Sequence, residues 1–196
     1  MLNESEIIIQ ILQGNRNLYK FLVEKYQSMI FRTCLGFLHN KNDADDLTQE
    51  IFIQVYQTLS KFRGDSAFST WIYRIAVNAA LNKVRKSRKN LIFEQIESIF
   101  DPEKKKTSEI TFSENDNPET ILILQEHREW LKNALNKLPE KQQTAIVLSK
   151  YDELSQKEIA EIMNTTEGAV EALIQRAKAN LRAILVPEKK KNKKLP

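Results

Sequence analysis

Glycine, proline and cysteine are scarce in this chain. Four glycines and five prolines among 196 residues leave few turn signals, whereas residues that favour helices, such as leucine, lysine, glutamate and alanine, are abundant. A turn-rich β fold is therefore disfavoured, and we expect an all-α protein. The length allows two small domains or one of medium size, and composition alone does not choose between them.

The single cysteine, Cys34, excludes both an intramolecular disulfide and a metal cluster built on cysteines. A reducing cytoplasm fits this best. Long apolar runs are missing too, since no stretch approaches the roughly 18 residues that span a bilayer. Acidic residues precede the short apolar run near the N-terminus, unlike a signal peptide. We expect a soluble, cytoplasmic protein without membrane insertion.

Features of enzymes are also sparse. His39 and His127 stand alone, and no glycine-rich phosphate loop is present. The carboxylates between Asp43 and Glu50 lie along one expected helix without a histidine to complete a metal site. We therefore expect no catalytic residues, no metal and no cofactor.

The net charge of +4 supports a polyanionic partner only weakly, and the distribution of charge says more. Two basic runs stand out, at residues 83–89 and 189–194, and acidic residues outnumber basic ones between 91 and 120. This alternation indicates two nucleic-acid-facing patches separated by an acidic connector. A pair of solvated charge runs would explain it equally well.

Apolar spacing predicts four helices in the first half of the chain. The first begins near Asn3 to Ser5 and ends at Gly14, and the second runs from Leu18 to about His39. The third is capped by Asn42 or Asp43. The fourth follows a loop at 62–69, starts after Ser69 or Thr70 and ends in the basic run. The third helix has an expected buried face of Ala44, Leu47, Ile51, Val55 and Leu59.

The pattern predicts two small helical domains joined by a flexible linker. The first covers residues 1–89, and the linker covers 90–119, where periodicity fades and Pro102 and Pro118 interrupt any helix. The second covers 120–186, with helices at about Thr120–Asn136, Glu140–Tyr151, Ser155–Met163 and Glu167–Leu185. The basic tail at 187–196 is expected to be disordered.

The segment Leu154–Arg182 has the pattern of a helix-turn-helix. Ser155 caps a short helix, Asn164 suits a left-handed turn and Thr166 caps a second helix. Such a second helix enters the major groove and its exposed residues meet base edges. An ordinary helical hairpin is the alternative. The exposed positions are Glu167, Glu171, Ala172, Gln175, Arg176 and Lys178.

The segment Phe62–Lys86 interleaves aromatic, amide and basic side chains along a loop and a helix. Exposed aromatics can stack on unpaired bases while Arg and Lys hold the backbone, which is how single strands are gripped. The opposite interpretation is equally open on the residues alone, because Phe68, Trp71 and Tyr73 could all be core.

Taken in order, these segments resemble the sigma-70 family, specifically its minimal extracytoplasmic-function (ECF, group 4) type. The stretch DADDLTQEIFIQVY, from Asp43, resembles region 2.2, which docks on the coiled coil of the polymerase β′ subunit. FSTWIYRIAVNAALN, from Phe68, resembles regions 2.3 and 2.4, which open the minus-10 element and capture a flipped base. LPEKQQTAIVL, from Leu138, resembles the start of region 4.

The resemblance implies a sigma factor that directs RNA polymerase to promoters and assists melting, without catalysis. Implied partners are core polymerase, through its β′ and β subunits, and promoter DNA; many family members are also held by an anti-sigma factor. Implied polymerase contacts are Asp45, Asp46, Gln49 and Glu50. Implied minus-10 contacts are Phe62, Arg63, Ser66, Phe68, Ser69, Thr70, Arg74, Asn78, Asn82 and Arg85. Implied minus-35 contacts are Glu171, Ala172, Gln175, Arg176, Lys178 and Arg182.

Two positions depart from the family pattern. Asn82 stands where the family usually has Asp, and Glu171 with Ala172 offers less positive charge than many recognition helices.

Two rival functions make distinct predictions. A stand-alone helix-turn-helix repressor would bind an operator tightly without polymerase, and a helical adaptor would show no salt-dependent affinity for DNA.

Overall fold

The structure is a computed structural model that describes the backbone of residues 3–100 and 129–185 and the side chains of residues 3–88 and 129–185. Within these ranges it contains helices and no strand, which confirms the all-α prediction. Short 3-10 turns lie at Arg16–Leu18 and Leu59–Lys61, and residues 129–136 are helical. The α-helices are α1 Glu4–Leu12, α2 Tyr19–Leu38, α3 Lys41–Thr58, α4 Phe68–Phe100, α6 Glu140–Lys150, α7 Gln156–Met163 and α8 Glu167–Leu185.

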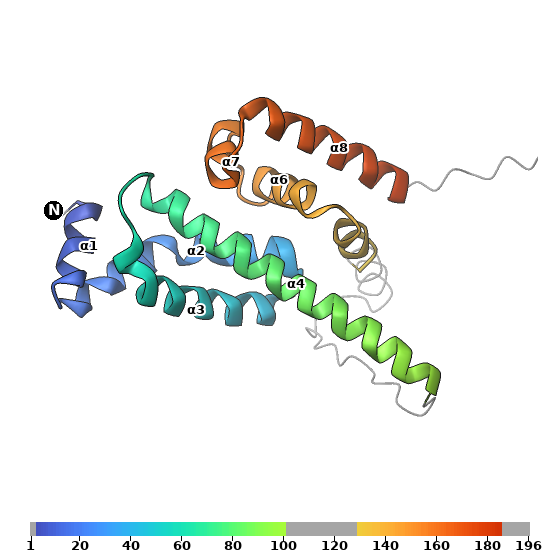
Figure 1. Ribbon diagram of the computed structural model, residues 1–196, viewed down its shortest axis with the longest axis horizontal. Helices are drawn as coiled ribbons and strands as arrows, with labels where there is room; N and C mark the ends of the chain where they lie inside the picture. The colour runs from blue at the N-terminus through green and yellow to red at the C-terminus, as the bar shows by residue number, and fades with distance from the viewer. Residues whose placement is uncertain (1–2, 101–128, 186–196) are drawn as a thin grey trace, which may run out of the picture.

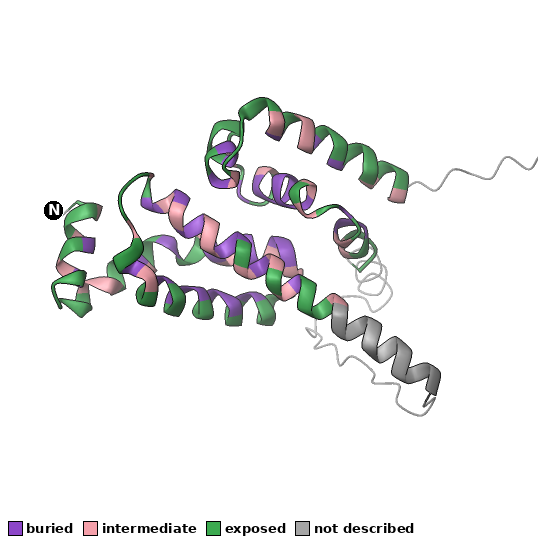
Figure 2. Cartoon of the chain, in the orientation of Figure 1, coloured by how far each residue is buried: buried purple, intermediate pink, exposed green. Residues whose placement is uncertain are grey.

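Helices α2, α3 and α4 pack against one another, and α1 lies at one end of them (Figure 1). We call residues 3–100 the N-terminal bundle. Ile30, Ile51 and Ile72 come from the three different helices and are completely buried between them. The buried face predicted for the third helix is confirmed at every position, although Leu59 lies in the 3-10 turn that follows α3, and the polar face of α3 stays exposed (Figure 2).

Local polar contacts fix where these helices begin. Asn3 and Glu6 form a capping box at α1, which begins within the range predicted for its start. The prediction for α3 was wrong by two or three residues, because Asn40 is the cap and accepts a hydrogen bond from the backbone N–H of Asp43. His39 adopts a left-handed conformation with φ of 55°. The chain therefore reverses within two residues, without a longer loop between α2 and α3.

Helix α4 is longer than predicted at both ends. It begins at Phe68, earlier than the expected start after Ser69 or Thr70, and it continues to Phe100, into the stretch predicted as linker. The reason is in the sequence, since neither glycine nor proline occurs between Gly64 and Pro102 to interrupt a helix. The remainder of the predicted linker, the residues up to 128 and the tail from 187 lie outside the described residues.

Helices α6, α7 and α8, preceded by the helical residues 129–136, form the C-terminal bundle, residues 129–185. Ser155 caps α7 in a capping box with Glu158, and Asn164 takes the left-handed turn with φ of 51°. Thr166 then accepts a hydrogen bond from the N–H of Ala169, at 3.2 Å, in the first turn of α8. All three turn residues therefore behave as predicted.

The two bundles pack directly against each other, which the sequence did not predict. Helix α7 lies over the N-terminal part of α4, and α6 lies against α2 (Figure 1). The two bundles come close together at Gly36 in α2, where an added Cβ would lie within 2.7 Å of Val147 Cγ1 and 3.0 Å of Tyr151 Cγ. Buried apolar residues of both bundles consequently form one continuous core.

Candidate nucleic-acid and polymerase interfaces

The segment α7–turn–α8 has the form of a helix-turn-helix. Ile159 of α7 and Val170 of α8 are completely buried at its centre. Ala160, which follows Ile159 in α7, is also buried. Leucine, isoleucine and alanine side chains of α8 continue this buried stripe toward the core. The opposite side of α8 is left for contacts outside the molecule.

Five of the six residues predicted to read the minus-35 element are exposed on α8, and Ala172 is half-buried. The six do not all face the same way. Ala172 and Arg176 line a cavity between α8 and α4, whereas Glu171, Gln175 and Lys178 are not part of its lining. The candidate recognition surface is therefore partly turned toward the N-terminal bundle.

The four residues predicted to contact polymerase lie on α3. Asp45, Asp46, Gln49 and Glu50 are all exposed, and their spacing of one and four residues places them on one side of the helix. The nearest cation among the described ion pairs is Lys83 of α4, whose Nζ lies 4.0 Å from Glu50 Oε1. Because all four residues are exposed, the described C-terminal bundle does not cover this acidic face.

An aromatic cluster supports the loop before α4. The ring of Phe68 lies 5.3 Å from that of Phe62 and 5.5 Å from those of Trp71 and Tyr26. Phe68 and Thr70 are buried, with exposed fractions of 2% and 7%, so these two predicted base contacts face inward in this structure. The other predicted loop residues are at least partly exposed: Phe62, Arg63, Ser66 and Ser69.

The remaining predicted minus-10 residues follow one side of α4, and two of them contact the C-terminal bundle. Arg74 donates a 2.7 Å hydrogen bond to the backbone carbonyl of Glu161 in α7. Arg85 donates two hydrogen bonds to the carboxylate of Glu140 in α6 and one, at 3.1 Å, to Asn82. The paired guanidinium lowers the pKa of the Glu140 carboxyl.

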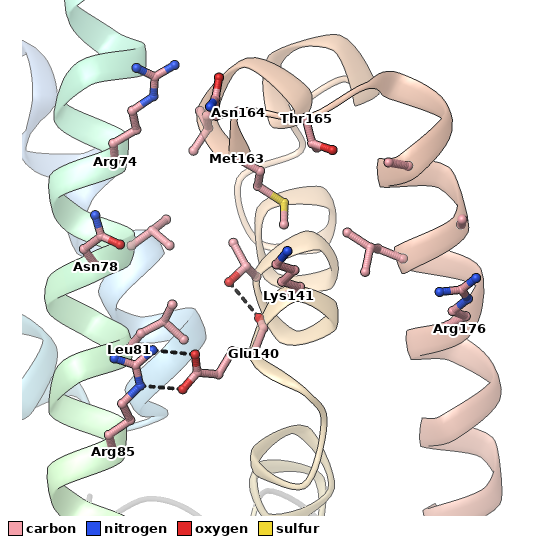
Figure 3. A pocket seen from close by; sticks show the side chains of 16 residues that line it. Arg74, Asn78, Leu81, Arg85, Glu140, Lys141, Met163, Asn164, Thr165 and Arg176 are labelled. Carbon is pink, nitrogen blue, oxygen red and sulfur yellow. Dashed lines mark hydrogen bonds and ion pairs between the residues drawn. The ribbon is translucent and has the colours of Figure 1, made fainter.

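A cavity of about 620 Å³ lies between α4 and the C-terminal bundle (Figure 3). Its α4 wall holds Arg74, Asn78 and Arg85, and its opposite wall holds Asn164 and Arg176. Residues predicted for the minus-10 and the minus-35 elements therefore face the same space. This arrangement could not be predicted from the sequence, because the partners Glu140 and Glu161 are ordinary surface positions of their own helices.

Among the residues that the structure describes, no group of three or more His, Cys, Asp or Glu side chains is placed to hold a metal ion. No described helix combines the length and apolar character that a membrane crossing requires.

Comparison with known proteins agrees with this geometry. The family models for Sigma-70 region 2 and Sigma-70 region 4 match residues 22–90 and 128–181. RNA polymerase sigma-H factor of Pseudomonas aeruginosa is 32% identical over 188 residues, which covers 94% of both chains. The ECF RNA polymerase sigma factor SigW of Bacillus subtilis is 32% identical over 89% of this chain and 92% of its own. The sigma-E factor of Escherichia coli K12 is 33% identical over 90% and 91%.

Solved structures show the same fold. CnrH, in complex with the cytosolic domain of CnrY, aligns with a TM-score of 0.62 and 22% identity over 91% of this chain and 94% of its own. The sigma factor RpoE of Bartonella quintana, in complex with the anti-sigma factor NepR, aligns with a TM-score of 0.55 and 18% identity over 87% and 98%.

The chain belongs to the sigma-70 family, within its extracytoplasmic-function group. It is a transcription initiation factor that takes bacterial RNA polymerase to specific promoters. The residues that match region 2 lie in the N-terminal bundle, and nearly all of those that match region 4 lie in the C-terminal bundle.

Proposed function

We propose that α3 is the principal docking surface for the β′ subunit of core polymerase. The supporting observation is that Asp45, Asp46 and Gln49, together with Glu50, are exposed on one side of a helix whose other side is fully buried. A rigid helix holds these acidic and amide groups in a fixed array, and such an array suits a partner surface rich in basic side chains.

We propose that region 4 reads the duplex minus-35 element through α8. Gln175 can pair with adenine, and Arg176 can contact guanine or phosphate. Glu171 can accept from cytosine, and Ala172 can contact a thymine methyl group. Lys178 and Arg182 lie further along the exposed helix and serve as phosphate contacts.

We propose that region 2 captures the melted minus-10 strand. Phe62, Arg63, Ser66 and Ser69 present the loop to a flipped base, and the buried Phe68 and Thr70 hold that loop in place from beneath. Unstacking a base costs a few kcal/mol, which stacking and backbone contacts must offset. The backbone contacts fall to the polar row along α4, formed by Arg74, Asn78, Asn82 and Arg85.

The mechanism we propose is binding without bond chemistry, in the cytoplasm and without a cofactor. We propose that region 2 occupies residues 1–89 and region 4 residues 120–186, joined by a linker at 90–119 whose first residues continue helix α4 up to Phe100, and followed by a basic tail at 187–196. An anti-sigma factor is a further proposed partner, since RpoE, whose fold this chain shares, was solved with the anti-sigma factor NepR, and CnrH was solved with the cytosolic domain of CnrY. The repressor alternative is not favoured, because it leaves region 2 without a role.

Promoter-directed transcription with purified core polymerase from the source organism tests this proposal. Genomic fragments serve as template, with and without the protein. We expect specific new starts that vanish in the variant Asp46→Ala/Gln49→Ala. The double variant Glu24→Ala/Gln27→Ala, an acidic and an amide residue exposed on α2, is the matched control and should retain them. If the protein bound duplex DNA but neither bound core polymerase nor produced new transcripts, it would instead be a repressor.

A further inference from the structure

The cavity between α4 and the C-terminal bundle collects more positive charge than the protein itself neutralises. Its lining holds four cationic side chains and a single carboxylate, that of Glu140, which is already paired with Arg85. Among the ion pairs of the described residues, none involves the other three cations, Arg74, Lys141 and Arg176. Four cations less one carboxylate leave a surplus of three positive charges, which α4, α6 and α8 supply around one space (Figure 3).

Arg74 also has a donor that the protein leaves unused. Its guanidinium donates one 2.7 Å hydrogen bond, from Nη2 to the backbone carbonyl of Glu161. Its Nε atom is buried and has no hydrogen-bond partner within the described part of the chain. A buried donor without an acceptor costs free energy, and a ligand oxygen would remove that cost. The donors of a guanidinium form a fork that suits the oxygens of a phosphate group.

Apolar side chains form another part of the same wall. Leu81 of α4, Met163 of α7 and Leu173 of α8 line the cavity and are only partly buried. A methionine thioether packs well against an aromatic ring, and the two leucines extend that apolar surface. The volume of about 620 Å³ lies within the range of about 300–1,000 Å³ that is usual for small-ligand sites. A ligand that uses the whole cavity therefore has an anionic part and an aromatic part.

We propose that this cavity binds a nucleoside triphosphate, with its phosphates on the three surplus cations and its base against the apolar wall. Cations from three helices suit a chain of phosphates better than a single one. The nucleotide is a bound ligand and undergoes no reaction. Because Arg74 and Arg176 are also proposed DNA contacts, nucleotide and promoter DNA would compete for them. That competition rests on the proposed function, whereas nucleotide binding itself does not.

Calorimetric titration of the full chain tests the site directly. The probes are ATP, GTP, inorganic tripolyphosphate and adenosine, at fixed salt and without divalent cations, so that the phosphates keep their charge. We expect saturable binding of ATP or GTP at one site per chain. The tighter of the two nucleotides should bind at least about tenfold more tightly than tripolyphosphate or adenosine, because each of these makes only part of the contacts.

Two variants test the cations. Lys141→Ala and Arg176→Gln change exposed side chains, so neither disturbs the core, and each should weaken binding of the tighter nucleotide at least about fivefold. Lys150→Ala, on the same helix as Lys141, and Arg16→Gln are the matched controls. They remove the same charges at exposed positions outside the lining and should change the affinity less than about twofold.

Three results would each overturn the proposal. The first is no saturable binding of ATP or GTP at millimolar concentration. The second is tripolyphosphate binding as tightly as both nucleotides, because the cavity would then be a general polyanion surface. The third is an equal loss of affinity in the control variants, because affinity would then follow net charge alone. None of these readouts involves polymerase or promoter DNA, so failure of the nucleotide site and failure of the proposed promoter function are distinguishable.

Discussion

Thr33 and Asp152, 119 positions apart in the sequence, meet at 2.9 Å in the contact between the two bundles. The Thr33 hydroxyl also lies 3.1 Å from the carbonyl oxygen of Met29, and one hydroxyl proton cannot serve two acceptors. A protonated Asp152 carboxyl resolves this, because it can donate to Thr33 while Thr33 donates to Met29. Consistently, burial raises the pKa of Asp152 to about 6.

The contribution of Asp152 to the contact between the bundles should therefore weaken as pH rises, whereas His39, whose pKa burial beside Tyr151 lowers to about 4, contributes in the opposite direction below about pH 6.5. The pKa of Asp152 is about 6 when closed and near its ordinary 3.8 when exposed, so its contribution to closure is complete below pH 3.8 and is lost as pH passes 6. The charged groups around it are Arg32 of α2 and, beyond Tyr73 of α4, Glu158 of α7. Arg32, 4.0 Å away, offsets only part of the burial cost.

Energy transfer between dyes on Gln57→Cys and Ala183→Cys, two exposed positions in different bundles, checks this linkage when it is followed from about pH 5 to about pH 8. Asp152→Asn should stay closed over the whole range, since an amide can donate to Thr33 at any pH. The Arg85–Glu140 pair does not produce the same trend, because its carboxyl pKa is lowered and it stays ionised in this window. An identical pH profile in the Asn variant would contradict the assignment.

Much of the fold was predictable because its determinants are local. Ser155, Asn164 and Thr166 each act on backbone groups within three or four residues, so the helix-turn-helix could be located to the residue. The buried face of α3 follows from periodicity alone. The cap at Asn40 was missed because three neighbouring polar residues compete for one role, and only the path of the chain after His39 decides among them.

The rest depended on contacts between distant segments. Gly36 looks like a weak point in an apolar helix until Val147 is placed against it. Phe68 matched a base-binding loop by position in the sequence, but its burial depends on how Tyr26 and Trp71 surround it. Nothing local to Glu140 indicates that it pairs with Arg85. Site residues could thus be proposed by resemblance, whereas the contacts of Arg74 and Arg85 with the C-terminal bundle required the three-dimensional arrangement.

The left-handed residue Asn164 should be replaceable by glycine but not by alanine. Its φ of 51° is strained for a residue with a Cβ, and Asn tolerates it better than most. We expect Asn164→Ala to lower the free energy of unfolding by about 1 kcal/mol and Asn164→Gly to change it little. Thermal unfolding of the full chain measures both, and equal losses would show that the side chain matters for another reason.

Two exposed residues of α8 should affect promoter binding in different ways. Lys178→Ala should weaken binding of the holoenzyme to all promoters alike and reduce the slope of log affinity against log salt by about one. Gln175→Ala should leave that slope unchanged and relax the preference for one base by about 1–3 kcal/mol. Binding to a set of minus-35 variants over a range of salt separates these effects. A shift of sequence preference in the lysine variant would contradict its role.

The two phenylalanines at the loop before α4 should separate stability from promoter opening. Phe68 is 2% exposed and packs against three other rings, so Phe68→Ala should lower the free energy of unfolding by about 3–5 kcal/mol. Phe62 is only half-buried, so Phe62→Ala should cost much less stability and instead slow strand opening, because a stacking surface for an unpaired base is lost.

Thermal unfolding measures stability, and the reactivity of unpaired thymines in the promoter complex measures strand opening. Phe68→Leu, which keeps most of the buried volume, should recover both stability and opening, since Phe68 supports the loop without touching the base. If Phe68→Leu were as stable as wild type but failed to open promoters, the ring of Phe68 would have to leave the core and contact DNA directly, and its burial would describe only the free protein.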